Sequence, residues 1–270
     1  MTSTNRVEIE IKNHIAHVSL ARPDKHNAID LDMFQTIVDT IKKLKKNRSI
    51  RAVILSGQGP DFCTGLDVKS VLKSKKGPMK LLFKLNPWAS NLAQKVSTYW
   101  QKIPVPVIAA IHGRCWGGGL QIALGADFRI VTPDASLSIM EARWGLIPDM
   151  GGTLPLREHC RIDIVKELAM TGKLFDGNAA QNYGIATHVS DKPLEKAQQL
   201  ADELCQQSPD TVAAVKKLYN KSWLSSAGSA LMRESVYQLK IMMGKNMRIK
   251  THNQTHEPEE HKNFDERKKW

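Results

Sequence analysis

The sequence predicts an α/β fold with parallel or mixed sheet layers. Apolar and polar residues alternate over residues 7–11 and 15–20, a spacing that is typical of half-buried strands. An amphipathic helix is predicted over residues 29–46, and a short apolar strand follows it over residues 51–57. The order of strand, strand and helix recurs further along the chain, and this repetition supports the α/β class.

The first unit contains two strands, a turn, a helix and a third strand. The polar residues 12–14 separate the first two strands, and residues 22–27 have the proline and asparagine of a turn. The helix over residues 29–46 has one apolar stripe, because its apolar residues recur three or four positions apart: Leu31, Phe34, Ile37, Val38, Ile41 and Leu44. The strand over residues 51–57 closes this unit.

The second unit follows a less regular stretch in which residues 73–87 predict a mobile basic loop. Residues 105–112 predict a buried strand, and a helix is predicted to begin at Gly117. Two further strands are predicted over residues 128–131 and 137–140. The second unit therefore repeats the alternation of strands and helix that the first unit shows.

The last third of the chain is predicted to be helical. One helix is expected near residues 164–169, and three more are expected over residues 193–207, 209–223 and 227–246. Residues 251–270 are strongly polar. We therefore predict a core over residues 1–190 and a helical C-terminal region over residues 191–270.

Positive charge is concentrated in two stretches of the chain. The formal net charge is +12. Residues 42–51 and residues 69–84 each contain several lysines or arginines and no acidic residue. Such a surface favours phosphate-bearing or polyanionic ligands. The alternative is a solvated basic face that only keeps the protein soluble.

Composition excludes several classes of protein. Hydrophobic residues make up 41% of the chain and charged residues 24%, which excludes wholesale disorder. No apolar run approaches the ~20 residues of a spanning helix, and the first residues lack a signal peptide's apolar segment. We expect a cytoplasmic protein with no membrane partner. The four cysteines form no CxxC pair, so we expect free thiols and no metal site.

Two loops of the predicted fold are suited to bind a negative oxygen. Gly117, Gly118 and Gly119 lie between a strand and a helix, where glycine lets the backbone approach a ligand. The helix start presents unpaired N–H groups to an anion. The loop of residues 62–67 also lies between a strand and a helix and supplies a second donor. Two such N–H groups on one carbonyl oxygen form an oxyanion hole.

Two carboxylates flank the next predicted turn. Glu141 precedes a Gly-Leu-Ile-Pro sequence, and Asp149 follows it. A chain reversal between them directs both side chains into one pocket, where burial raises their pKa and suits them to proton transfer. Asp149 also has a structural alternative, since it precedes a helix predicted over residues 150–158 and is suited to cap it.

Taken together, these segments resemble the crotonase superfamily of enoyl-CoA hydratases and isomerases. Four motifs carry the resemblance over nearly the whole chain: ARPDKHNAID, FCTGLDVKSV, HGRCWGGGLQIAL and MEARWGLIPDMGGT. The resemblance implies a spiral of repeated β-β-α units with a C-terminal helical trimerisation region. It also implies homotrimers or hexamers and an acyl-CoA substrate. No separate cofactor is implied, because coenzyme A is part of that substrate.

The resemblance also implies roles for individual residues. The N–H groups of Leu66 and Gly118 are expected to hold the thioester oxygen, which becomes negative when a C2 proton leaves. Lys25, His26 and Ala28 are expected beside the coenzyme A moiety. The other implied substrate contacts are Asp67 and Val68 near its adenine and pantetheine, and Thr64, Trp116, Gly117 and Gln121 in the rest of the site.

Gln121 departs from the hydratase pattern. Hydratases of the family use two glutamates, one at the position of Glu141 and one at the position of Gln121. The amide of Gln121 does not exchange protons at neutral pH. Asp149 matches an aspartate of the dienoyl-CoA isomerases, although these usually have an acid at the position of Gln121 too. We therefore predict an isomerase that shifts a double bond through Glu141, with Asp149 or alone.

Three alternatives stay open at this point. Gln121 and Glu141, or Asp149, share a water if the protein hydrates 2-enoyl-CoA. A catalytically silent coenzyme A binder is the second alternative, because one glutamate is missing. RNA binding through the lysines of residues 42–51 is the third, as in some relatives. The chain has no aromatic RNA-reading motif, so we do not expect RNA as a partner.

Overall fold

The computed structural model describes residues 5–73 and 77–270. Within this part of the chain, six strands form the main sheet in the order β1-β2-β3-β4-β6-β8. The first two strands pair antiparallel and the other neighbours pair in parallel. The strands are β1 (Val7–Lys12), β2 (Ile15–Leu20), β3 (Ala52–Gly57), β4 (Val107–Ile111), β6 (Phe128–Val131) and β8 (His188–Val189). The predicted mixed sheet is confirmed.

A smaller sheet lies beside the main one. Among the described residues it contains two parallel strands, β5 (Arg114–Trp116) and β7 (Ser136–Ser138). The strand predicted over residues 137–140 is shorter than expected, because the chain turns into the 3₁₀ segment η3 (Glu141–Trp144). This turn starts the chain reversal that the sequence predicted after residue 140.

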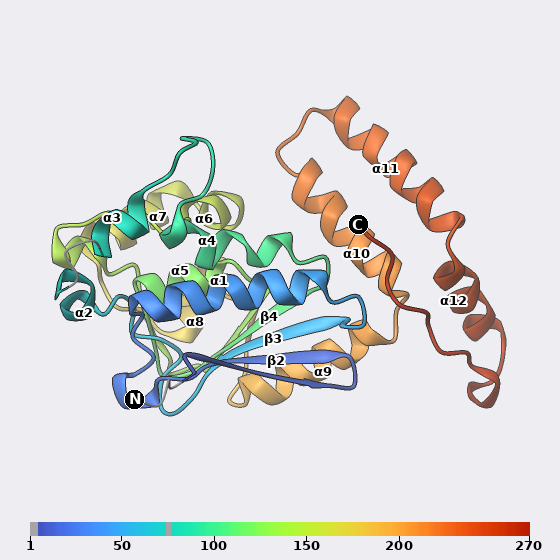
Figure 1. The fold of residues 1–270 in the computed structure, drawn as a ribbon, viewed down its shortest axis with the longest axis horizontal. Helices are drawn as coiled ribbons and strands as arrows, with labels where there is room; N and C mark the ends of the chain where they lie inside the picture. Colours follow the sequence, from blue (N-terminus) through green and yellow to red (C-terminus); the bar gives the residue numbers. More distant parts are fainter. Residues whose placement is uncertain (1–4, 74–76) are drawn as a thin grey trace.

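Helices cover both faces of the main sheet (Figure 1). One face carries α1 (Leu31–Lys46), α4 (Leu92–Thr98) and α5 (Gly118–Leu124), and the other carries α9 (Pro193–Cys205). Successive strand residues point to opposite faces. In β3, Val53 and Leu55 therefore join the main core, whereas Ala52 and Ile54 pack with Ala197 and Ala201 of α9.

Helix α1 begins two residues later than predicted, because Asp30 caps it. The Asp30 side chain accepts a hydrogen bond from the Met33 N–H at 2.9 Å. The predicted apolar stripe is almost entirely buried. The other short elements are α2 (Val68–Lys73), α3 (Gly77–Leu82), α6 (Thr153–His159), α7 (Ile162–Thr171), α8 (Gly177–Asn182), and the 3₁₀ segments η1 (Pro23–Lys25), η2 (Trp100–Lys102) and η4 (Pro258–Glu260).

The predicted loop over residues 73–87 is in part helical, since α3 lies within it, and its residues 74–76 lie outside the described part of the chain. The helix predicted over residues 150–158 begins at Thr153. Its N-cap is Gly152, so the capping role considered for Asp149 is wrong.

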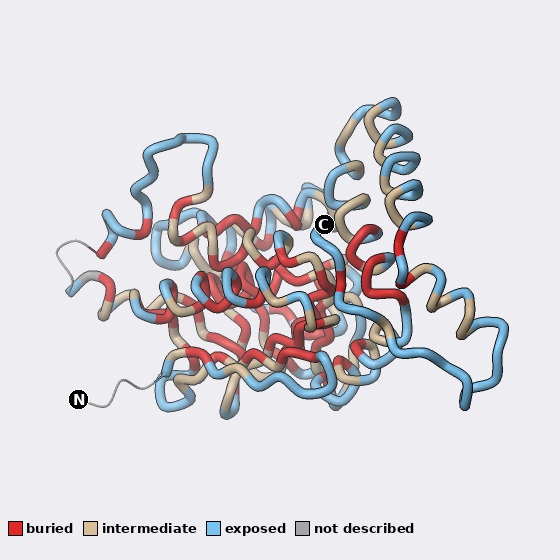
Figure 2. Tube along the Cα trace, turned by 45° about the vertical axis from the view of Figure 1, so that its right-hand side comes forward, coloured by how far each residue is buried: buried red, intermediate tan, exposed pale blue. Residues whose placement is uncertain are grey.

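Three C-terminal helices project from the body as an arm (Figure 1). They are α10 (Pro209–Ser222), α11 (Ala227–Met242) and α12 (Lys245–Thr255). The single helix predicted over residues 227–246 is divided, because Gly244 caps the start of α12. The arm is largely exposed or half-buried (Figure 2). The domain boundary near residue 190 stays a prediction; α9, which follows it, packs on the sheet.

The end of the chain ties this arm back to the body. Arg267 is buried, and its carbonyl oxygen accepts a hydrogen bond from Arg48 Nε at 2.7 Å. Its own guanidinium donates to the Asn47 carbonyl oxygen at 3.1 Å. No helix within the described residues is long and apolar enough to cross a membrane.

Candidate active site

A cavity of about 350 Å³ lies at the carboxyl ends of β3, β5 and β7. The three loops that follow these strands meet around it. Most of the predicted site residues line this cavity: His26, Thr64, Leu66, Val68, Trp116, Gly117, Gly118, Glu141 and Asp149. Lys25, Ala28 and Asp67 line an adjoining outer cavity of about 660 Å³. The structure therefore brings together residues that lie more than a hundred positions apart in the sequence.

A short backbone ladder holds the two glycine-containing loops together. Cys63 and Cys115 are partners in a parallel bridge, and the Trp116 N–H donates to the Cys63 carbonyl oxygen at 3.0 Å. Gly65 has a φ of +87°, and a Cβ there would lie 2.8 Å from the Trp116 oxygen and 3.3 Å from the Gly118 nitrogen. The loops approach this closely only because residue 65 is glycine.

The backbone amides of Leu66 and Gly118 are free. Within the described part of the chain, neither N–H donates to another residue. Gly118 is the first residue of α5, where an N–H has no partner inside its own helix. Two free donors on adjacent loops at one cavity are suited to bind a negative oxygen.

Gln121 connects Glu141 to the turn that follows it. Gln121 is 2% exposed, and its Nε2 donates to Glu141 Oε1 at 2.6 Å. Its Oε1 accepts from the Met150 N–H at 2.9 Å and from the Gly152 N–H at 3.1 Å. Gln121 was predicted to contact substrate, but it lies behind Glu141 and outside the cavity lining. Both ends of its amide are occupied by the protein itself.

The two oxygens of the Glu141 carboxyl group have different surroundings, and only Oε1 is bonded to Gln121. Oε2 is buried and has no hydrogen-bond partner within the described residues. Burial raises the pKa of Glu141, and the nearby charge of Asp149 acts in the same direction, whereas the hydrogen bond from Gln121 opposes both. Burial also raises the pKa of Asp149. Two carboxyl groups with raised pKa at one cavity are suited to give and take protons.

The outer cavity is basic. Lys25, Lys69 and Lys73 are among its lining residues. The carboxylates of Asp24 and Asp67 line it too. Asp67 is occupied by the protein, because it pairs with Arg22 at 2.8 Å and accepts from the Ser70 N–H at 3.0 Å. Positive charge therefore predominates at the entrance, which favours a ligand that carries phosphate groups.

Sequence reasoning missed an ionic network at the wall between the two cavities. Asp61 is nearly buried and accepts two hydrogen bonds from the Arg114 guanidinium, at 2.8 and 2.7 Å. His26 Nδ1 lies 2.8 Å from the same carboxylate. Burial acts to raise the pKa of Asp61, but the hydrogen bonds and charge of Arg114, with the His26 contact, lower it overall. The network fixes His26 and Arg114 at the cavity wall. The arginine in the HGRCW motif is the sequence feature from which this network could have been predicted.

Sequence reasoning also missed an apolar wall of the inner cavity. Met140, Leu146, Ile147 and Met150 line the cavity beside the two acids. Trp144 lines both cavities and is 64% exposed. The motif MEARWGLIPDM carries all of these residues, so its apolar positions were the available signal. An apolar wall next to two acids is suited to hold a hydrocarbon chain during proton transfer.

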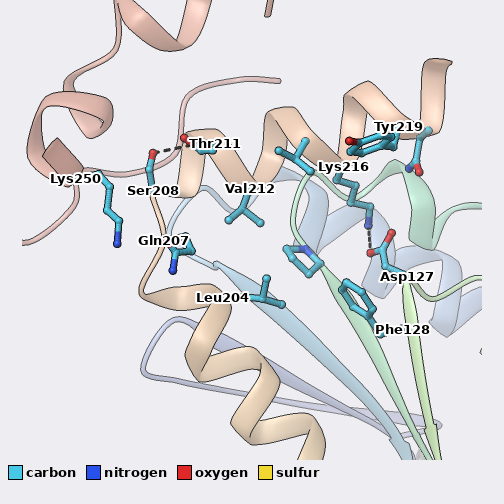
Figure 3. Close-up of a pocket in the computed structure, with 13 residues that line it drawn as sticks. Asp127, Phe128, Leu204, Gln207, Ser208, Thr211, Val212, Lys216, Tyr219 and Lys250 are labelled. Carbon is cyan, nitrogen blue, oxygen red and sulfur yellow. Dashed lines mark hydrogen bonds and ion pairs between the residues drawn. The ribbon is translucent and has the colours of Figure 1, made fainter. Parts of the chain in front are cut away.

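A second large cavity, of about 420 Å³, lies near the amino ends of β4 and β6 (Figure 3). Lys216 lies on its lining and donates to Asp127 Oδ2 at 2.6 Å and to the Val105 carbonyl oxygen at 2.9 Å. This lysine is occupied by the protein, and the cavity has no paired acids among its lining residues. Nor does any group of three or more His, Cys, Asp or Glu among the described residues have a metal-binding arrangement.

Known proteins are similar to this chain in both sequence and fold. A family model described as enoyl-CoA hydratase/isomerase matches residues 10–270. Carnitinyl-CoA dehydratase of Proteus mirabilis is 32% identical over 235 residues, which cover 85% of this chain and 87% of the relative. The mitochondrial Delta(3,5)-Delta(2,4)-dienoyl-CoA isomerase of Dictyostelium discoideum is 30% identical over 227 residues, covering 80% and 76%.

The fold comparison agrees with the sequence comparison. The crystal structure of enoyl-CoA hydratase from Thermoplasma volcanium superimposes with a TM-score of 0.82 at 26% identity, covering 94% of this chain and 98% of that one. The match to the family model extends over nearly the whole chain, and the fold agrees over the same extent. The chain therefore belongs to the enoyl-CoA hydratase/isomerase family of acyl-CoA enzymes and has the crotonase fold of that family.

Proposed function

We propose that the protein is an enoyl-CoA isomerase that moves a double bond along the acyl chain. The N–H groups of Leu66 and Gly118 hold the thioester oxygen. Glu141 removes a proton from C2, and the resulting enolate is stabilised by the two amides. Asp149, protonated at the start, returns a proton to a more distant carbon, so that one C–H bond breaks, another forms and the double bond shifts. Before the next turnover Glu141 loses its proton to solvent and Asp149 takes one up. No water is consumed.

The observation that carries this proposal is that the side-chain amide of Gln121 is already hydrogen-bonded to the protein at both its nitrogen and its oxygen. A hydratase needs two groups that activate one water, and Gln121 occupies the position of the second. Its Nε2 and its Oε1 are both used in hydrogen bonds to the protein. The two acids at the cavity are Glu141 and Asp149, on opposite sides of the apolar turn. This arrangement supports proton transfer between two carbons more than addition of water.

The coenzyme A moiety is proposed to occupy the outer cavity. Lys25, Lys69 and Lys73 supply positive charge for its phosphate groups. The acyl chain then lies along Met140 and Ile147 in the inner cavity. The two cavities adjoin each other, which supports a single ligand that extends from the outer cavity into the inner one. Four residues line both cavities: His26, Leu66, Val68 and Trp144.

Absorbance assays on purified protein test the reaction type. We expect turnover of 3-enoyl-CoA or 3,5-dienoyl-CoA with a kcat/KM about 10²-fold or more above that for hydration of crotonyl-CoA. Asp149→Asn should lower isomerisation of the dienoyl substrate about 10²-fold, because the returning proton loses its donor. Rapid hydration without double-bond migration would mean that the protein is a hydratase.

Activity is expected to depend on pH through Glu141. The carboxylate form removes the C2 proton, and burial raises the pKa of this group. Lowering the pH through that raised pKa protonates Glu141, so kcat/KM should fall on the acid side at a higher pH than for an ordinary glutamate. The pH profile of isomerisation measures this inflection. A profile that stays flat down to the ordinary glutamate range would contradict the role of Glu141.

The arm is proposed to join three copies of the chain. Helix α11 has no buried residue, and it exposes large apolar side chains: Leu231, Met232, Val236, Leu239 and Met242. Exposed apolar faces of this extent are typical of subunit contacts. Light scattering is expected to give the mass of a trimer or of a hexamer. Leu231→Asp combined with Leu239→Asp should produce monomers, and Ile11→Asp on exposed β1 should not.

A further inference from the structure

We propose that residues 79–88 form a contact surface for a bilayer that contains anionic lipids. This segment, from α3 into the loop before α4, exposes large apolar side chains: Met79, Leu82, Phe83, Leu85 and Trp88. Leu85 is 93% exposed and Trp88 is 96% exposed. An apolar cluster of this kind marks an interaction site, because each side chain stays in water at a free-energy cost.

The segment is tied to the rest of the protein at Leu81 and at the start of α4. Leu81 is buried in the core at 6% exposure. Asn91 and Gln94 form a capping box at the start of α4, and Asn91 Nδ2 also donates to the Leu82 carbonyl oxygen at 3.4 Å. Asn86 Oδ1 accepts from the Trp88 N–H at 2.9 Å. These hydrogen bonds give the loop a defined conformation, in which the five exposed apolar side chains lie outside the core.

The charge around the segment selects the kind of partner. The sequence has no acidic residue between Asp67 and Asp127. Lys80 and Lys84 lie within the segment, and both are exposed. Lysine beside exposed aromatic and leucine side chains is the combination by which peripheral proteins bind an anionic lipid surface. Trp and Phe side chains settle at the headgroup level, while the lysines attract the acidic headgroups.

The arm of a second copy is a less suitable partner for this segment. The basic residues of the arm outnumber its acids: Lys216, Lys217, Lys221, Arg233, Lys240, Lys245, Arg248 and Lys250 against Asp210 and Glu234. Two basic surfaces repel each other, whereas anionic lipid attracts the segment. Figures 1 and 2 show the segment as a loop that projects from the body, apart from the arm. The loop is thus placed to reach a flat surface.

A surface contact of this kind needs no spanning helix. The expectation of no membrane partner depended on the absence of a long apolar run in the sequence. A peripheral site needs only a few apolar side chains and nearby positive charge. The inference stands independently of the isomerase proposal, because it uses none of the cavity residues.

Co-sedimentation of the full-length protein with vesicles tests the inference. We expect binding to vesicles of phosphatidylcholine with phosphatidylglycerol, little binding to phosphatidylcholine alone, and weaker binding as salt increases. Leu85→Ser combined with Trp88→Ser should weaken binding about tenfold or more. Lys80→Gln combined with Lys84→Gln should weaken binding to anionic vesicles in the same direction. Ile162→Ser combined with Met170→Ser, at side chains that are 71% and 73% exposed on α7, is the matched control and should bind as the wild type does.

Several results would overturn the inference. One is the absence of binding to anionic vesicles at low salt, and another is equal loss of binding in the α7 control. If the Leu85 and Trp88 variant binds normally but its mass by light scattering changes, the segment is a contact between copies and not a lipid surface. Isomerase activity measured without vesicles should be the same in this variant and in the wild type, which separates this test from that of the reaction.

Discussion

Replacement of Glu141 with glutamine is expected to lower kcat for isomerisation about 10³-fold. Glutamine has the shape of glutamate but cannot accept the C2 proton. Its amide oxygen still accepts the hydrogen bond from Gln121 Nε2, so the geometry of the turn is retained. Steady-state kinetics with an enoyl-CoA or dienoyl-CoA substrate measures the loss. Unchanged turnover in Glu141→Gln would mean that the protein binds coenzyme A without using this acid.

The stability of the same variant provides a control with a defined sign. Burial raises the pKa of Glu141, so the folded protein binds a proton more tightly than the unfolded chain does. The stability from this group is present at low pH and is lost as the pH rises from the unfolded pKa through the folded pKa. At neutral pH, Glu141→Gln should therefore unfold at the same temperature as the wild type or higher. A lower melting temperature would show that the lost activity comes from a damaged fold.

Replacement of Gln121 with alanine is expected to reduce both stability and activity. The N–H groups of Met150 and Gly152 lose their shared acceptor and stay buried. Unsatisfied buried groups of this kind cost about 1–3 kcal/mol each, so denaturant unfolding should show a loss of about 3 kcal/mol. Glu141 also loses the hydrogen bond that opposes the rise of its pKa. The acid limb of the pH profile should therefore move to higher pH.

Gln121→Glu is the matched variant for this position. Its carboxylate still accepts from the N–H groups of Met150 and Gly152, so it should retain more stability than Gln121→Ala. It also places a second acid next to Glu141, which is the pattern of the family's hydratases. We expect a gain in hydration of crotonyl-CoA relative to the wild type. If neither variant changes the pH profile or the unfolding free energy, Gln121 does not position Glu141.

Much of the fold was predictable from local patterns. The apolar stripe of residues 29–46 identified α1, because burial of one helix face needs only the spacing of its residues. The loops that carry Leu66 and Gly118 were predictable too, since a glycine between a strand and a helix marks a close backbone approach. Helix ends were less predictable. Asp149 had the residue type and position of an N-cap, but the N-cap of α6 is Gly152.

The α/β class, the two glycine-containing loops, the pair of acids and the absence of a second glutamate at residue 121 all follow from residue types and their spacing. The role of Gln121 follows only from the folded chain, because its three hydrogen-bond partners lie 20 to 31 positions further along the sequence. The same holds for the Asp61–Arg114 pair beside His26, and for the exposure of Trp88. Local patterns report how a segment is buried, whereas hydrogen bonds between distant residues depend on how the segments meet in space.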